Sequence, residues 1–257
     1  MWNAFVELLF TLLQQIYYVV GDWGLAIIVF TIIIRLLMTP LMIKQTRSMY
    51  ELQKVQPLIK QIQEDYADDK ELQNQKMAEL YAEYKVNPFA SCLPMLLQMP
   101  IFFALYQMLA PITEKAAGGP LAQYLASTSG TGSFFNIIPN LMLTANEVFD
   151  GGKGFVATIP YFILLALFAV SMYLPQLIQQ GEKSQKMMGL YMSLFMLFIG
   201  WSVPAGVLLY WDTSSLIGVA QQWYTQRSLQ KATEGEEVLV LEEAKTPSKR
   251  PTKKGKK

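Results

Sequence analysis

The chain of 257 residues has no histidine and a single cysteine, Cys92. The lack of histidine excludes serine–histidine hydrolysis, histidine-based acid–base catalysis and histidine-ligated metal sites, and a lone cysteine forms no intramolecular disulfide. The sequence has no Walker A motif, no GxGxxG loop and no metal-ligand spacing. An intramembrane aspartyl mechanism would need a second carboxylate at the depth of Asp212. These absences predict a protein that is not an enzyme and needs no cofactor or metal.

Charge is also scarce, because only 16% of the residues are charged while 52% are hydrophobic. The charges gather in two blocks, and the apolar runs outside them are long enough to cross a bilayer as helices. We therefore expect an all-α polytopic membrane protein with five transmembrane helices. Trp23 should act as the interfacial anchor of the first. The expected spans are 23–43, 89–112, 158–180, 187–201 and 204–224.

The N-terminal segment 1–22 is apolar but carries polar side chains on one helical face, at Glu7, Thr11, Gln14 and Gln15. This pattern predicts an extracytoplasmic interfacial helix, with a further transmembrane span as the alternative.

Residues 44–88 switch to a soluble composition and predict a cytoplasmic helical hairpin, whose second arm opens at a capping box from Asp68 to Glu71. A hairpin that only connects two spans is the alternative. The other connections are an extracytoplasmic loop at 113–157, a short cytoplasmic loop at 181–186 and a disordered basic cytoplasmic tail at 225–257.

Positive residues are unequally distributed between the two sides of the membrane that this order of spans implies. Of the 21 Lys and Arg residues, 18 lie in 44–88, 181–186 and 225–257, whereas the opposite side has only Lys115 and Lys153. Because positively charged loops remain in the cytoplasm, we expect the N-terminus outside and the C-terminus in the cytoplasm.

Arg35 lies inside the first apolar run, about 18 Å along the helix from Trp23 and past the middle of a hydrocarbon core about 30 Å thick. Its guanidinium does not lose its charge. Exposing it to lipid costs about 2.5–3.5 kcal/mol on insertion scales and roughly 10–17 kcal/mol in simulations. We therefore expect a polar recess shared with other helices. The alternative is a side chain that snorkels to the interface.

Other polar side chains fall at membrane depth. Thr31 shares a helix face with Arg35, Gln98 lies in the second span, and the fifth span carries the run Tyr210–Ser215. A lipid-facing helix does not accommodate such a run, so several spans should converge on a wet interior surface. We expect an ion pair between Arg35 and Asp212, directly or through water. The alternative is that Asp212 faces a separate water pocket.

Four features of the sequence occur in a recognisable order. They are the late arginine of the first span with Pro40 after it, the charged hairpin, the proline-rich stretch Asn87 to Tyr106, and Pro204 to Trp211 followed by Gln221-Gln222. Over residues 20 to 228 this order resembles the YidC family of membrane protein insertases. It is similar to the short form of that family, which lacks the large extracytoplasmic domain.

The resemblance implies a hydrophilic groove that is open to the cytoplasm and to lipid, closed on the outside, and able to receive the polar end of a nascent helix. It implies that Arg35 is the groove arginine. The other residues it assigns to the groove or to substrate contact are Thr31, Gln98, Met99, Phe102, Tyr210 and Trp211.

Two further residues of the predicted groove, Asp212 and Ser215, depart from the family pattern. Asp212 stands where apolar residues are usual, and Ser215 replaces a common asparagine. Pro175 in the third span is another departure. If Asp212 neutralised Arg35, the groove would attract acidic substrate segments less strongly.

The predicted function is that of a membrane protein insertase or chaperone of the bacterial cell membrane, which moves nascent transmembrane helices into the bilayer. Nascent membrane proteins are its expected partners. So are the ribosome, through the basic tail and cytoplasmic loops, the Sec translocon, and anionic lipids. The alternatives are an ion- or proton-coupled transporter that uses Arg35 and Asp212, and a structural scaffold. No inverted repeat, which many transporters have, is visible among the five expected spans.

Overall fold

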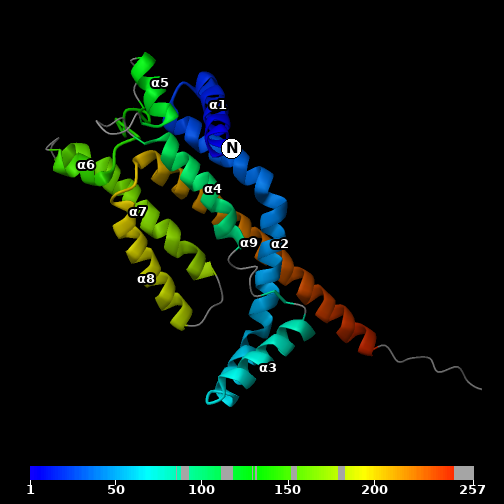
Figure 1. Ribbon diagram of the computed structural model, residues 1–257. Coiled ribbons are helices and arrows are strands. Elements are labelled where there is room, and N and C mark those ends of the chain that lie inside the picture. Colours follow the sequence, from blue (N-terminus) through cyan, green and yellow to red (C-terminus); the bar gives the residue numbers. More distant parts are fainter. Residues whose placement is uncertain are drawn as a thin grey trace, which may run out of the picture.

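The computed structural model describes residues 1–84, 86–87, 93–110, 118–128, 130, 132–151, 155–178 and 183–245. Within these ranges the chain is helical apart from turns and two isolated β-bridges, which confirms the expected all-α class. Two long helices, α2 (Trp23–Asp65) and α9 (Ala205–Lys245), run side by side (Figure 1). The helix α4 (Leu93–Met108) packs beside both of them, and α7 (Phe155–Ile178) joins α9 to α8 (Lys183–Gly200).

The two ends of this bundle differ. One end carries the short helices α5 (Pro120–Thr128) and α6 (Ala145–Asp150) together with α1 (Trp2–Val20), and we call it the loop end. The opposite end carries α3 (Lys70–Glu83), and we call it the hairpin end (Figure 1).

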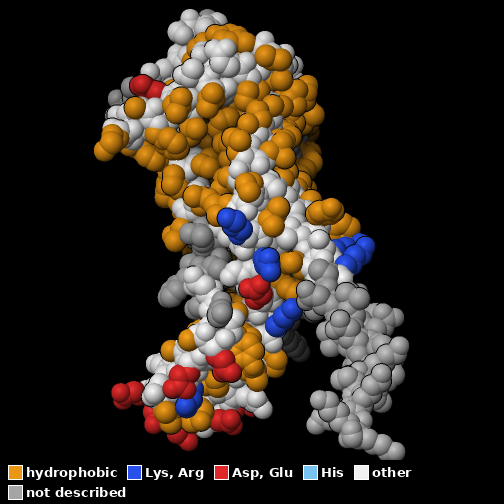
Figure 2. Space-filling model, turned by 90° about the vertical axis from the view of Figure 1, so that its right-hand side faces the viewer, with side chains coloured by type: hydrophobic (Ala, Val, Ile, Leu, Met, Phe, Trp, Pro, Cys, Tyr) orange, Lys and Arg blue, Asp and Glu red, His pale blue; other side chains and the backbone are white. Residues whose placement is uncertain are grey.

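The surface of the loop-end part of the bundle is strongly apolar. Large side chains such as Leu37, Phe155 and Phe198 are at least 75% exposed, and Figure 2 shows apolar side chains over most of this part and charged ones toward the hairpin end. Soluble proteins rarely expose apolar surface of this extent, so this surface belongs in lipid. Three helical stretches, Trp2–Val20, Trp23–Asp65 and Phe155–Pro175, are long and apolar enough to span a bilayer, and Leu96–Met108 and Met187–Gly200 are shorter apolar helices. The number of five spans stays a prediction.

The first span and the first arm of the hairpin form one helix. α2 continues through Pro40 and Pro57 to Asp65, although each proline removes a backbone hydrogen bond from the helix. The second arm, α3, begins after Asp69, whose side chain accepts a hydrogen bond from the Leu72 amide at 3.0 Å. The predicted cap at Asp68 was therefore wrong by one residue, and α3 ends at Glu83.

The last helix is longer than expected. We expected disorder from residue 225, but α9 continues to Lys245. The segment 225–245 has no proline and is rich in Glu, Lys, Gln, Leu and Ala, which are strong helix formers. Residues 246–257 of the predicted tail lie outside the described ranges, as do 113–117 of the predicted loop and both 89–92 and 111–112 of the predicted second span.

The junction between α1 and α2 is a tight, capped turn. Gly21 adopts a φ of 74° and donates to the Tyr17 carbonyl at 2.8 Å, which ends α1. The Asp22 carboxylate then accepts from the Leu25 amide at 2.9 Å and from the Phe135 amide at 2.7 Å. Trp23, expected at the membrane interface, is instead 1% exposed and stacks on Tyr17 with ring centroids 4.1 Å apart. The predicted anchor is a core residue.

The hydrophobic core lies toward the loop end. It contains fully buried side chains from three helices, namely Ile27, Leu105, Met108, Leu109 and Val207. At the start of α9, the Ala205 and Gly206 amides donate to the carbonyls of Leu143 and Leu141 at 2.9 and 2.8 Å. These bonds satisfy amide groups that a helix N-terminus leaves unpaired. Packing and backbone hydrogen bonds therefore close the bundle at its loop end.

Candidate functional site

The two long helices run in the same direction and meet along a line of polar side chains. The Nε of Arg35 on α2 donates to the Oγ of Ser214 on α9 at 2.7 Å. About one turn nearer the hairpin end, the Nε2 of Gln221 donates to the Oγ1 of Thr39 at 2.7 Å. We call this line, formed by Arg35, Thr39, Tyr210, Ser214 and Gln221 together with Gln98 of α4, the polar seam.

The helix α4 reaches the seam through Gln98, whose Nε2 donates to the hydroxyl of Tyr210. Tyr210 is 1% exposed, lies one turn before Ser214, and interacts electrostatically with both Ser214 and Arg35. Thr31 lies one turn before Arg35, is fully buried, and donates to the Ile27 carbonyl at 2.6 Å. The structure thus brings Arg35, Gln98 and Tyr210 into one cluster, with Thr31 behind it.

The guanidinium of Arg35 lies against α9 at Gly218, where the helix has no side chain. A Cβ atom at Gly218 would lie 3.2 Å from Nη1 of Arg35 and 3.5 Å from its Cζ. Arg35 is half-buried, and the only hydrogen bond that it makes to a described side chain comes from Nε. Since a guanidinium has five N–H donors, its terminal amino groups retain donors for water or for an incoming polar group.

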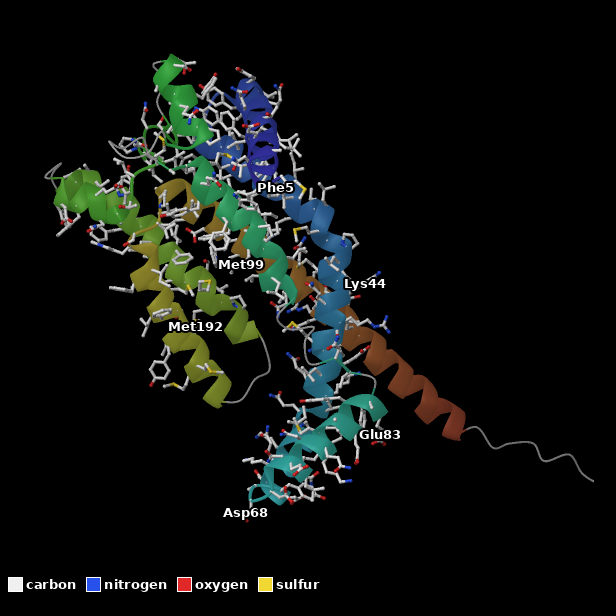
Figure 3. The ribbon with its side chains drawn as sticks, in the orientation of Figure 1. Phe5, Lys44, Asp68, Glu83, Met99 and Met192 are labelled. Carbon is white, nitrogen blue, oxygen red and sulfur yellow. The ribbon has the colours of Figure 1, made fainter. Side chains whose placement is uncertain are left out.

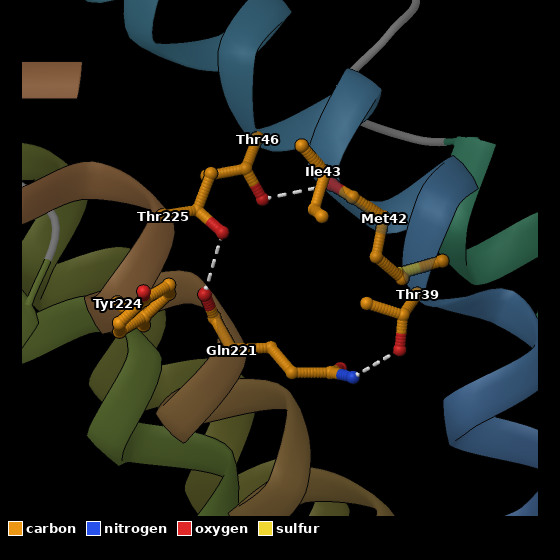
Figure 4. A pocket seen from close by; sticks show the side chains of 7 residues that line it. All are labelled: Thr39, Met42, Ile43, Thr46, Gln221, Tyr224 and Thr225. Carbon is orange, nitrogen blue, oxygen red and sulfur yellow. Dashed lines mark hydrogen bonds between the residues drawn. The ribbon is translucent and has the colours of Figure 1, made fainter. Parts of the chain in front are cut away.

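Toward the hairpin end, a cavity of 160 Å³ lies between α2 and α9 (Figure 4). Its threonine hydroxyls donate to carbonyls of their own helices, at distances of 2.8–2.9 Å, so carbon atoms form most of its wall. Its lining residues are Thr39, Met42, Ile43, Thr46, Gln221, Tyr224 and Thr225. Lys44 projects from α2 at the same level (Figure 3). The polar seam therefore leads from the closed loop end to this cavity, which lies on the hairpin side of Arg35.

Phe102 and Trp211 pack next to the seam and join three helices. The Trp211 ring lies 5.2 Å from that of Phe102 on α4 and 5.4 Å from that of Phe168 on α7, both edge to face. Its Nε1 donates to the Sδ of Met172 at 3.2 Å. Met99 is half-buried on α4 beside Gln98 (Figure 3). These residues form an apolar wall next to the polar groups.

Asp212 and Ser215 lie on another side of α9 and face α7. The Oγ of Ser171 lies 3.2 Å from the Oδ1 of Asp212, and Ser215 donates to the Ser171 carbonyl at 2.8 Å. Residues 212 and 214 are separated by about 200° around a helix, so Asp212 points away from the seam in which Ser214 binds Arg35. A direct ion pair between Arg35 and Asp212 was therefore a wrong prediction.

The sequence interpretation included Ser214 in the polar run Tyr210–Ser215 but did not assign Thr39, Gly218 and Gln221 to the site. Thr39 follows Arg35 by four residues and Gln221 follows Ser214 by seven, so a helical wheel drawn from Arg35 and Tyr210 would have found these two. Gly218 follows Ser214 by four residues and shares this face, but a glycine has no side chain that would mark it as a site residue.

Comparison with known proteins gives consistent results. The family model of the 60Kd inner membrane protein matches residues 15–232. The chain is 36% identical over 232 residues to the membrane protein insertase YidC of Francisella tularensis subsp. novicida, and 35% identical to that of Francisella philomiragia; each alignment covers 90% of this chain and 37% of the relative. The chain thus spans little more than a third of the length of these relatives.

A solved structure is also similar. It is described as an active YidC insertase crystal structure with the first transmembrane domain resolved. The TM-score is 0.64 at 27% sequence identity, over 86% of this chain and 46% of the other. The resemblance seen in the motifs is confirmed by these matches, and they give no support to a transporter.

Proposed function

This chain belongs to the family of the 60Kd inner membrane protein, and from this membership and its polar seam we propose that it is a membrane protein insertase. Its substrates would be nascent membrane proteins, and its task would be to move their transmembrane helices from the cytoplasm into the bilayer. The observation that carries the proposal is Arg35, a permanent cation held by Ser214 at 2.7 Å within an apolar bundle.

The seam supports a route with one open end. The buried core closes the loop end, whereas the cavity of 160 Å³ lies at the hairpin end. A polar segment that enters from the hairpin end would meet Gln221 and Thr39 first and Arg35 further in. Gln98 and Tyr210 line the inner part of this route, with Met99, Phe102 and Trp211 as its apolar wall.

The energetics require no nucleotide and no bond to be made or broken. Arg35 and Gln98, with Tyr210 behind them, would provide a polar surface for the polar end of the substrate, which shortens the distance that it must cross in hydrocarbon. The driving force would be the burial of the substrate helix in lipid, about 0.8 kcal/mol for each CH₂ group.

The protein is a bacterial inner-membrane protein. We propose that its hairpin end and C-terminus are cytoplasmic and its N-terminus external, since the Lys and Arg residues are concentrated in the segments of the hairpin end and the C-terminal region. This basic end would contact ribosomal RNA and anionic lipid headgroups. A complex with the Sec translocon is a further proposal, which is based on the expected type of substrate.

Site-specific crosslinking to a stalled nascent chain tests this function. A photoreactive residue at Gln98 should crosslink to a single-span substrate in proteoliposomes. The same residue at Phe198, which is 78% exposed on α8, serves as a lipid-facing control and should give little product. Equal yields at both positions would contradict the proposed route.

The charge in the seam is tested by insertion itself. Arg35→Ala should lower the yield of inserted substrate about tenfold or more, which corresponds to the loss of about 1.4 kcal/mol or more of interaction, and Arg35→Lys should restore part of it. Unchanged insertion by Arg35→Ala would indicate a scaffold. Ion flux through the same liposomes without insertion would indicate a transporter.

A further inference from the structure

Asp212 is an acidic residue that is buried inside the helical bundle. Its side chain is 5% exposed, and it lies in the contact between α7 and α9 and not in the polar seam. Its Oδ2 has no hydrogen-bond partner among the described residues. The contact of this carboxyl group is with α7 and not with the polar residues of the proposed substrate route.

The hydrogen bonds around Ser171 are too few for an ionised carboxylate. The Ser171 hydroxyl lies 2.9 Å from the Phe168 carbonyl and 3.2 Å from Oδ1 of Asp212. A serine hydroxyl has one proton to donate, and the Phe168 carbonyl is the nearer of the two acceptors. With the proton directed at Phe168, the contact between Ser171 and Asp212 becomes a hydrogen bond in which Asp212 is the donor.

Among the described side chains of the neighbouring helices, no titratable group supplies a counter-charge to Asp212. On α2, Arg35 donates to Ser214 on a different side of α9. On α9, Tyr210 accepts from Gln98, and on α7, Tyr161 donates to the Asn140 carbonyl at 2.8 Å. The other tyrosine of α7, Tyr173, makes no described contact with Asp212, and α4 places the phenyl ring of Phe102 against this part of α9.

We propose that Asp212 is a proton-binding site. Its carboxyl group carries a proton on Oδ1 at neutral pH and donates it to the Oγ of Ser171, which in turn donates to the Phe168 carbonyl. An ionised carboxylate in an apolar interior without a cation is strongly disfavoured, so the bound proton stabilises the close contact between α7 and α9, and this contact in turn holds the proton. Release of the proton requires that water enters between α7 and α9.

Ser215 completes the arrangement. Its hydroxyl donates to the Ser171 carbonyl at 2.8 Å, which fixes α9 against the turn of α7 that carries Ser171. Ser171 and Ser215 both belong to this second site, and the only ligand of the site is a proton. The carboxyl group is shielded from water, so the site does not conduct protons across the membrane.

Infrared spectroscopy of the full chain in lipid nanodiscs tests the proposal directly. The wild-type protein at neutral pH should show the C=O stretch of a protonated carboxylic acid, and Asp212→Asn should lack it. Ser171→Ala should retain the band but move it to higher frequency, since the acid group loses its hydrogen-bond acceptor. A wild-type spectrum without this band, or a band that persists in Asp212→Asn, would overturn the proposal.

Discussion

Gly218 offers the sharpest test of the space around Arg35. A leucine there would bring its first side-chain atom 3.2 Å from Nη1 of Arg35, and its branched end would occupy the volume that the guanidinium now fills. The atoms that it would meet are the end of a flexible side chain, so we expect the guanidinium to move. It then loses its hydrogen bond to Ser214.

The magnitude is set by two opposing contributions. Leucine is a better helix former than glycine by about 0.8 kcal/mol, whereas a hydrogen bond to a charged group contributes about 1.5–3 kcal/mol. Gly218→Leu should therefore destabilise the protein by about 1–2 kcal/mol. Gly218→Ala places only a methyl group near the end of a flexible side chain, so the propensity gain should prevail and stability should rise by up to about 1 kcal/mol.

The assay combines thermal unfolding in nanodiscs with insertion of a single-span substrate into proteoliposomes. The matched control is Ala220→Leu, which adds a leucine to an exposed position two residues further along α9. Gly218→Leu should insert at least tenfold less substrate than Ala220→Leu, while Gly218→Ala should stay close to wild type. If Gly218→Leu and Ala220→Leu insert equally well, the position of the guanidinium does not matter for function.

Two further predictions concern single hydrogen bonds. Tyr210→Phe leaves the Gln98 amide without its acceptor and should lower the free energy of unfolding by about 1–3 kcal/mol. In a double-mutant cycle, the variant that combines Tyr210→Phe with Gln98→Leu should lose less stability than the sum of the two single variants. Strict additivity would refute the contact. Asp22→Ala removes both the cap of α2 and the bond to Phe135, so hydrogen exchange at the α1–α2 junction should rise, with a loss of about 1–2 kcal/mol from the cap alone. Asp69→Ala removes only the cap of α3 and should affect only the hairpin; global destabilisation by Asp69→Ala would contradict this assignment.

Much of the fold could be read from the sequence because its signals are local. Apolar runs and the charged block at 44–88 predicted helices, and the all-α class that they indicated is confirmed. Helix ends were less accurate, as at Asp69 and Lys245. A terminal segment such as 225–245 carries both the charge of a tail and the composition of a helix, and its charge alone suggested disorder.

The core position of Trp23 could not be read from the sequence for a different reason. A tryptophan at the start of an apolar run is typical of an interfacial anchor. Its burial depends on Tyr17, which stacks on it, and on Tyr124 of α5, which lies 101 residues away in the chain and 5.7 Å away between ring centroids. Only the folded arrangement of α1 and α5 brings these rings together.

The rotation of α9 decided which polar residues meet. The run Tyr210–Ser215 covers every side of a helix, so the sequence alone left open which member faces α2. In the structure Tyr210 and Ser214 face Arg35, whereas Asp212 and Ser215 face Ser171. Attraction between opposite charges suggested the ion pair, but packing of α9 against both α2 and α7 prevails over it.

This separation suits the chemistry of the two ionisable groups. A guanidinium cannot lose its charge, so it needs polar neighbours and access to water, and Arg35 is half-buried beside a line of hydroxyl and amide groups. A carboxyl group can become neutral by taking up a proton, so it tolerates a sealed apolar site such as that of Asp212. An Asp212 that is both neutral and turned away leaves the positive charge of the polar seam uncompensated. Acidic segments of a substrate should therefore still be attracted to Arg35, and Asp212→Asn should leave the preference for them intact when acidic and neutral substrates compete for insertion.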